Sequence, residues 1–326
     1  MDEQMATNKY PAKGVVLQPM RIQARNGSRA EKNYYAKSTL PGGAWPMPKA
    51  IAPGISPAPL DDLMFHGGRV IPQMEFQNIF IGGAAAWQAS DVANINVSID
   101  RAMRDRRLNN VMTQYFPGVK PSCDMRTAIF DTAAKPVAMD EAAVQAKVVA
   151  LFDGGKISRK DVGTTLFNLV LPSGTLLRLD GDSSLDGLGG YHGSVHIKRA
   201  GKNITLYYSA NVFSEVRADG RENGIAVFNR PWKNVVGTLY HEINEFRTDP
   251  DVGDAIATGQ DRFLGWTSRR GHEVGDQPIF KAGAAGNLGL VFKEVTASVG
   301  TRRLPVQFMY SNAVHGAEGP IATARP

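Results

Sequence analysis

The sequence contains almost no cysteine and no long hydrophobic segment. Of its 326 residues only Cys123 is a cysteine, which excludes an intramolecular disulfide and a zinc site built from several thiolates. No stretch approaches the roughly 20 apolar residues of a membrane-spanning helix. No apolar leader run of roughly 7–15 residues follows the N-terminus. These absences predict a cytoplasmic protein without a membrane span, and leaderless export is the alternative.

The basic residues are unevenly distributed along the chain. The formal net charge is +6, and residues 1–60 account for most of it, with eight basic and three acidic side chains. The same residues hold eight of the 19 prolines, which cannot all fit one regular element. We predict a basic, proline-rich extended arm over 1–60 and a nearly neutral domain over 61–326. The arm is either a tether or a contact to another subunit or an acidic partner, whereas nucleic acid is disfavoured.

Residues 61–326 combine helical and extended patterns. Apolar spacing predicts helices over 91–108 and 140–152. Short apolar runs bounded by turn residues predict strands at 70–81, 126–130, 165–171, 193–197, 204–209 and 224–228. The expected fold class is therefore α+β, with a mixed or antiparallel sheet flanked by helices.

A third predicted helix contains a pattern of metal ligands. Asn229 fits the N-cap, Pro231 fits the first turn, and Thr248-Asp-Pro250 ends the helix. Within it lies His241-Glu-Ile-Asn-Glu245. Residues four apart share one face of a helix, so His241 and Glu245 can bind the same ion.

Glu242 directly follows the first of these ligands. Beside a divalent ion such a carboxylate can act as general base on the bound water, as in the HExxH metallopeptidases. Zinc accepts one histidine and two carboxylates less commonly than two histidines and one glutamate, and oxygen-rich sets also suit calcium. We expect a divalent metal, with zinc favoured and calcium as the alternative. The motif alone also fits a solvated helix face on which His241 pairs with a carboxylate.

A second polar cluster follows at residues 265–276. His272, Glu273 and Asp276 lie there between glycines that predict a loop. One of these three side chains can complete the coordination of the metal, and the acids Glu273 and Asp276 are the favoured candidates.

Together these segments resemble a known family. His241-Glu-Ile-Asn-Glu-Phe-Arg-Thr-Asp-Pro250, Gly265-Trp266 and Glu273-Val-Gly-Asp276 are similar to the pattern "SHELAEAVTDP … GW(Y)D … GEIGD". That pattern is associated with bacterial and fungal relatives of the plant phosphate-induced, or EXORDIUM-like, proteins. Similar segments lie in the same order over residues 64–316, including Gly190-Tyr-His-Gly-Ser-Val195 and Pro305-Val-Gln-Phe-Met-Tyr-Ser-Asn312.

The resemblance implies a zincin-like region that holds a metal, in a family whose enzymatic role is poorly defined. By position, the residues that match the metal ligands are His241, Glu245, Glu273 and Asp276, and Glu242 matches the general base. Three further residues are candidates for contacts around those ligands: Asp249, His192 and His272. Relatives have cysteines near several of these segments, where this chain has Gly190, Gln277-Pro278 and Gly316-Ala317. The missing cysteines favour a reducing compartment.

Two classes of function follow from these observations. The first is a metal-dependent hydrolase, in the first place a peptidase acting on a peptide or protein substrate, with Glu242 as general base. The second is a non-catalytic structural or binding protein on a zincin-like scaffold, with a structural metal or none. An open coordination position beside Glu242 would favour catalysis, and a closed, oxygen-rich shell would favour a structural ion.

Overall fold

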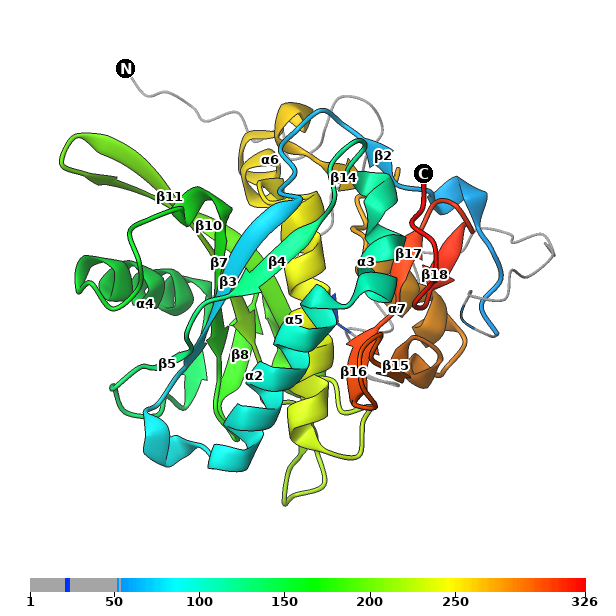
Figure 1. The fold of residues 1–326 in the computed structure, drawn as a ribbon. Helices are drawn as coiled ribbons and strands as arrows, with labels where there is room; N and C mark the ends of the chain where they lie inside the picture. Colours follow the sequence, from blue (N-terminus) through cyan, green and yellow to red (C-terminus); the bar gives the residue numbers. More distant parts are fainter. Residues whose placement is uncertain (1–20, 24–51, 53) are drawn as a thin grey trace.

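The computed structural model describes residues 21–23, 52 and 54–326. Most of the predicted arm over 1–60 lies outside these residues, so its extended character stays a prediction. The fold is built on one mixed sheet flanked by helices, which confirms that part of the expected fold class (Figure 1).

The main sheet has seven strands. Its order is β1 (Arg21–Gln23), β10 (Leu188–Arg199), β11 (Lys202–Asn211), β7 (Thr165–Val170), β3 (Gln73–Phe80) and β4 (Ser122–Met125), and β5 (Ile129–Phe130) also pairs with β3. The pairs of β10 with β1 and with β11 are antiparallel, whereas β11, β7, β3 and β4 run parallel. The predicted strands at 70–81, 165–171, 193–197 and 204–209 fall within this sheet.

Helices cover both faces of the sheet, and strand β7 shows how the sequence separates the two faces. Leu166 and Val170 pack into the core beneath the helices α2 (Ala89–Arg104) and α5 (Pro231–Thr248). Phe167 and Leu169 point to the other side, into the core beneath α4 (Glu141–Asp153). Alternating side chains of a buried strand thus fill two apolar cores.

The remaining elements surround α5 and the edges of the sheet (Figure 1). The other helices are α3 (Arg106–Met112), α6 (Val252–Thr258) and α7 (Asp276–Ala284). The short strands are β2 (Met64–Phe65), β6 (Ala138–Met139), β8 (Leu176–Leu179), β9 (Asp182–Ser183), β12 (Glu215–Val216), β13 (Glu222–Asn223), β14 (Trp266–Thr267), β15 (Phe292–Thr296), β16 (Arg303–Gln307), β17 (Met309–Ser311) and β18 (Gly316–Glu318). The β15–β16 hairpin packs against α5 on the side away from the sheet.

Two sequence predictions need correction. The helix predicted over 91–108 breaks after Arg104, because the Asp105 carboxylate accepts hydrogen bonds from the backbone N–H groups of Arg107 and Leu108 and so caps a new helix, α3. Residues 224–228 form no strand, because the N–H groups of residues 227 and 228 donate to the side chain of Asn234.

The ends of α5 agree with the sequence in most respects. The helix begins with Pro231 and ends at Thr248, as predicted. Its N-cap is Arg230, not the predicted Asn229.

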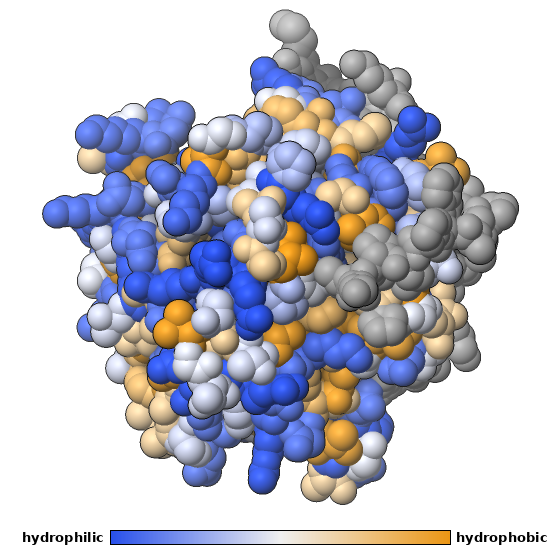
Figure 2. Space-filling view, turned by 45° about the vertical axis from the view of Figure 1, so that its right-hand side comes forward, coloured by the Kyte–Doolittle hydropathy of each residue, from blue (hydrophilic) through white to orange (hydrophobic). Residues whose placement is uncertain are grey.

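The outer surface mixes polar and apolar residues. On the face in Figure 2, hydrophilic side chains are interspersed with small apolar areas. Among the residues that the structure describes, no helix is both long and apolar enough to cross a membrane.

Candidate metal centre

The C-terminal half of α5 is buried together with its charged side chains. Every residue from Asn234 to Thr248 is buried. His241, Glu242 and Glu245 each have 0% exposure. The interpretation of a solvated helix face is therefore wrong. Charged groups with no access to water require a partner of opposite charge close by.

Three ligand-competent atoms meet around His241. Its Nε2 lies 3.0 Å from Oε2 of Glu245 and 3.8 Å from Oδ1 of Asp276. The other oxygen of Glu245, Oε1, accepts hydrogen bonds of 3.1 Å from the N–H groups of Gly275 and Asp276. These bonds hold the Glu245 carboxylate with Oε2 turned toward the imidazole. The three side chains can together hold a metal ion.

The hydrogen bonds of Gln307 define the state of the His241 ring. The Gln307 amide nitrogen donates to the carbonyl of Gly275 at 2.6 Å, so its oxygen is the atom that lies 2.9 Å from His241 Nδ1. Nδ1 therefore carries a proton, and Nε2 is the nitrogen that faces Glu245, as a second N–H in the imidazolium or as a lone pair in the neutral ring. Within the described part of the chain, neither Nε2 nor Oε2 of Glu245 has a hydrogen-bond partner. An imidazole nitrogen and a carboxylate oxygen 3.0 Å apart are held together by a positive charge, which is either a proton on Nε2 or a metal ion.

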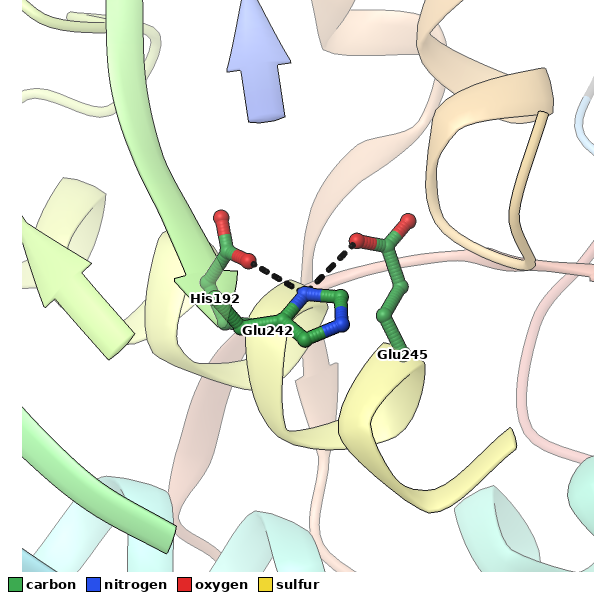
Figure 3. A group of neighbouring side chains, drawn as sticks. All are labelled: His192, Glu242 and Glu245. Carbon is green, nitrogen blue, oxygen red and sulfur yellow. Dashed lines mark hydrogen bonds and ion pairs between the residues drawn. The ribbon is translucent and has the colours of Figure 1, made fainter. Parts of the chain in front are cut away.

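A second group shares Glu245 with the first. His192, from β10, places Nδ1 3.3 Å from Oε2 of Glu242 and 3.7 Å from Oε2 of Glu245 (Figure 3). On the other side of the ring, Nε2 lies 3.3 Å from the carbonyl oxygen of Asp249 and 3.7 Å from Oε1 of Glu273. His192, Glu242 and Glu245 form a second set that can hold an ion.

The other predicted site residues occupy different positions. Glu273 faces His192, not His241. Asp249 accepts a 2.8 Å hydrogen bond from the N–H of Gly265 and so holds the first residue of the segment 265–276 in place. His272 stacks on Phe280 with ring centroids 4.1 Å apart and belongs to neither ligand group. Burial lowers the pKa of His272 to about 4, so this ring is neutral.

Two glycines allow the backbone to approach these side chains. A Cβ at Gly190 would lie 3.1 Å from Oε1 of Glu242 and 2.8 Å from the carbonyl of Ala210. A Cβ at Gly275 would overlap the His241 ring. Gln307 was not singled out from the sequence as a site residue, although it lies in the segment "VQ" of the family resemblance. Only its hydrogen bonds identify its role.

The cluster contains more negative than positive groups. Burial raises the pKa of Glu242, of Glu273 and of Asp276, and it raises the pKa of Asp249 to about 8. Burial disfavours the charged form of His241, but the neighbouring Glu245 carboxylate outweighs it and raises the pKa of His241 to about 10. These directions describe a site that gathers positive charge, as protons or as a metal ion.

Several buried atoms of the cluster lack hydrogen bonds within the described ranges. They are Glu242 Oε1, Glu245 Oε2, Asp249 Oδ2, Glu273 Oε1 and His241 Nε2. Buried polar atoms are hydrogen-bonded in the large majority of cases. Their concentration at one place fits atoms that are satisfied by a bound cation.

Comparison of this chain with models of known protein families, with curated protein sequences and with solved structures finds no match. What is established is therefore the arrangement itself, which is a buried group of histidines and carboxylates that can hold a metal ion.

Proposed function

We propose that this protein is a metal-dependent hydrolase, in the first place a peptidase, on a zincin-like scaffold related to the EXORDIUM-like family. The observation that supports this best is the 3.0 Å approach of His241 Nε2 to Glu245 Oε2, fully buried and without a hydrogen bond. A tetrahedral zinc site with bonds of about 2.0–2.2 Å separates its ligand atoms by roughly 3.3–3.6 Å. The distances from His241 Nε2 to Glu245 and Asp276, 3.0 and 3.8 Å, lie on either side of that range.

The ligands of this proposed site are His241, Glu245 and Asp276. An imidazole with two carboxylates suits zinc or a similar transition metal, whereas calcium takes oxygen ligands almost alone. Gln307 supports the assignment because it fixes the ring tautomer that leaves Nε2 free to coordinate. Such an outer hydrogen bond is typical of metal-binding histidines.

In this proposal Glu242 acts as the base. When bound, a divalent ion lowers the pKa of a coordinated water molecule to about 7. The Glu242 carboxylate would accept a proton from such a water at Oε1, which has no hydrogen-bond partner among the described residues. Burial raises the pKa of Glu242, which makes its carboxylate a stronger base. His192 holds the other oxygen, Oε2, at 3.3 Å.

One observation favours the second class of function. The three proposed ligands are at most 2% exposed, as in a closed structural site. Under this alternative the ion joins α5 to the loop before α7 and catalyses nothing. A cytoplasmic location stays part of the proposal and rests on the single, buried Cys123.

Metal analysis and one substitution distinguish these functions. The purified full chain is expected to contain a divalent transition metal by elemental analysis. Glu242→Gln should keep that metal and reduce hydrolysis of labelled casein by about 10³-fold, the middle of the range of about 10²–10⁴ for loss of a general base. The same substitution at Glu222, on the separate β12–β13 hairpin, should change neither quantity. A metal-containing but inactive wild type supports the structural alternative, and an active Glu242→Gln variant contradicts the role of Glu242.

A further inference from the structure

The edge of the main sheet beside the cluster of histidines and carboxylates is occupied by a segment of the protein's own arm. Strand β1 pairs antiparallel with β10, with Ile22 opposite Gly190 and Arg21 opposite Tyr191. β1 also contacts α5 and α7, the helices that contribute His241 and Asp276. In Figure 3 the blue arrow of β1 lies above the side chains of His192, Glu242 and Glu245 and points away from them, with its first residue on the side of the cluster.

Gly190 brings this edge close to the proposed base. Because Gly190 has no side chain, the backbone of β10 lies against Thr238 and against Oε1 of Glu242. One edge of β10 at Gly190 pairs with Ile22 of β1, and the other edge pairs with Asn211 of β11. His192, which contacts Glu242, lies two residues further along β10. A chain paired at this edge therefore passes beside the two residues of β10, Gly190 and His192, that lie against Glu242.

The charge of the arm suits this place. Residues 1–60 have eight basic and three acidic side chains, whereas the cluster contains five buried carboxylates and two histidines. The carboxylates of the cluster therefore favour the binding of a chain with basic side chains. The arm rejoins the described domain at Ala52, whose N–H donates to the carbonyl of Ala317 at 2.9 Å, so residues 24–51 connect the strand to its anchor.

An unpaired sheet edge offers a row of backbone donors and acceptors to any extended chain. Peptides commonly bind proteins by adding a strand to such an edge. Here the edge, the cluster and the competing strand belong to the same molecule.

We propose that the β10 edge at residues 188–191 is the docking strand for an extended polypeptide substrate, and that the arm segment Arg21–Gln23 occupies it and masks the site. This proposal rests on the proposed hydrolase function for its catalytic part only. Displacement of β1 opens the edge, and a substrate strand takes its place in the same antiparallel register.

Amide hydrogen exchange of the full-length protein tests the docking directly. Ile22→Pro/Gln23→Pro removes two neighbouring backbone donors and disfavours pairing. Exchange at residues 188–191 should become at least about tenfold faster, as expected when a local pairing is lost. Ser38→Pro/Thr39→Pro is the matched control further along the arm and should leave exchange there unchanged. Equal exchange in both variants would overturn the proposal.

A peptide in trans tests whether the edge accepts a separate chain. A synthetic peptide of residues 16–28 should restore protection of residues 188–191 in the Ile22→Pro/Gln23→Pro variant. It should bind wild type at least about tenfold more weakly, because the tethered arm competes at high effective concentration. Faster exchange without rescue by the peptide contradicts a docking role.

Hydrolysis provides a separate readout of masking. If Arg21–Gln23 masks the site, the Ile22→Pro/Gln23→Pro variant should cleave labelled casein about tenfold faster than wild type at equal metal content, a difference of about 1.4 kcal/mol. An unchanged rate with faster exchange overturns the masking. If wild type and variant are both metal-free and inactive, the proposed hydrolase fails, while exchange and peptide binding still judge the docking strand.

Discussion

Two long helices lie side by side on the same face of the sheet, and they are stabilised in different ways (Figure 1). α2 has 16 residues and buries only one stripe: Ile95, Ser98, Ile99, Ala102 and Met103. α5 has 18 residues and buries every residue from Asn234 to Thr248, including two glutamates, a histidine and Arg247. α2 therefore gains stability from apolar burial, whereas α5 requires compensation for buried charge.

The buried charges of α5 fall into two groups. Arg247 is only partly satisfied within the protein: its guanidinium donates to Asn109 at 3.1 Å and lies 5.6 Å from the centroid of the Phe116 ring, while its Nε has no hydrogen-bond partner among the described residues. His241, Glu242 and Glu245 also have buried atoms without a hydrogen bond among the residues described, but theirs belong to the two groups that can hold a metal ion. We therefore expect the contribution of α5 to stability to depend on a bound metal, and that of α2 to be independent of it.

The largest expected effect is the removal of metal from α5. Ion that binds only the folded chain stabilises it by about 4 kcal/mol at a free concentration 1,000 times Kd. Chelation should therefore lower the midpoint of thermal unfolding, and His241→Ala should abolish this metal-dependent increment. His196→Ala is the matched control, because His196 lies on β10 but is 56% exposed and pairs with Asp254. A midpoint that does not respond to chelation would remove the distinction between the two helices.

A smaller effect is expected from truncating the apolar stripe of α2. Ile99 is fully buried, so Ile99→Ala should reduce the free energy of unfolding by about 3 kcal/mol through lost burial and a cavity. Urea unfolding with and without chelator measures it. The loss should be the same in both conditions, because α2 contributes no ligand. A loss that depends on metal would show that the two helices are coupled.

The smallest effect concerns the approach of β10 to α5. Gly190→Ala places a methyl group 2.9 Å from Cγ2 of Thr238 and 3.1 Å from Oε1 of Glu242, and should cost about 1–3 kcal/mol by overpacking. Gly163→Ala is its control, because the nearest atom there is 3.5 Å away at the flexible end of Arg69. Urea midpoints of both variants measure the difference. Equal stability would mean that β10 can move away from Glu242.

The elements that could be predicted from the sequence are those with local signals. Asp140 caps α4 through a hydrogen bond to the N–H of Ala143, and Pro231 begins α5. The strand predicted at 224–228 was wrong because the side chain of Asn234, at the start of the following helix, accepts hydrogen bonds from the backbone N–H groups of residues 227 and 228. The break at Asp105 was missed because the apolar spacing continues across it, although the carboxylate caps the next helix.

The residues of the candidate site also fall into those that a local pattern identifies and those that only the fold assigns. His241, Glu242 and Glu245 were identified because their spacing on a helix is a local property. The sequence left Glu273 and Asp276 as equivalent choices, and only the fold separates them, with Asp276 toward His241 and Glu273 toward His192.

By itself, the sequence determined the absence of disulfides, the limits of α5, and the common face of His241 and Glu245, because composition, caps and helical period are local. Only the tertiary structure decided that this face is buried, that His192 and Gln307 reach it, and that the arm pairs with β10 beside it. The physical reason is that burial and long-range pairing depend on how whole elements pack, which no single segment encodes.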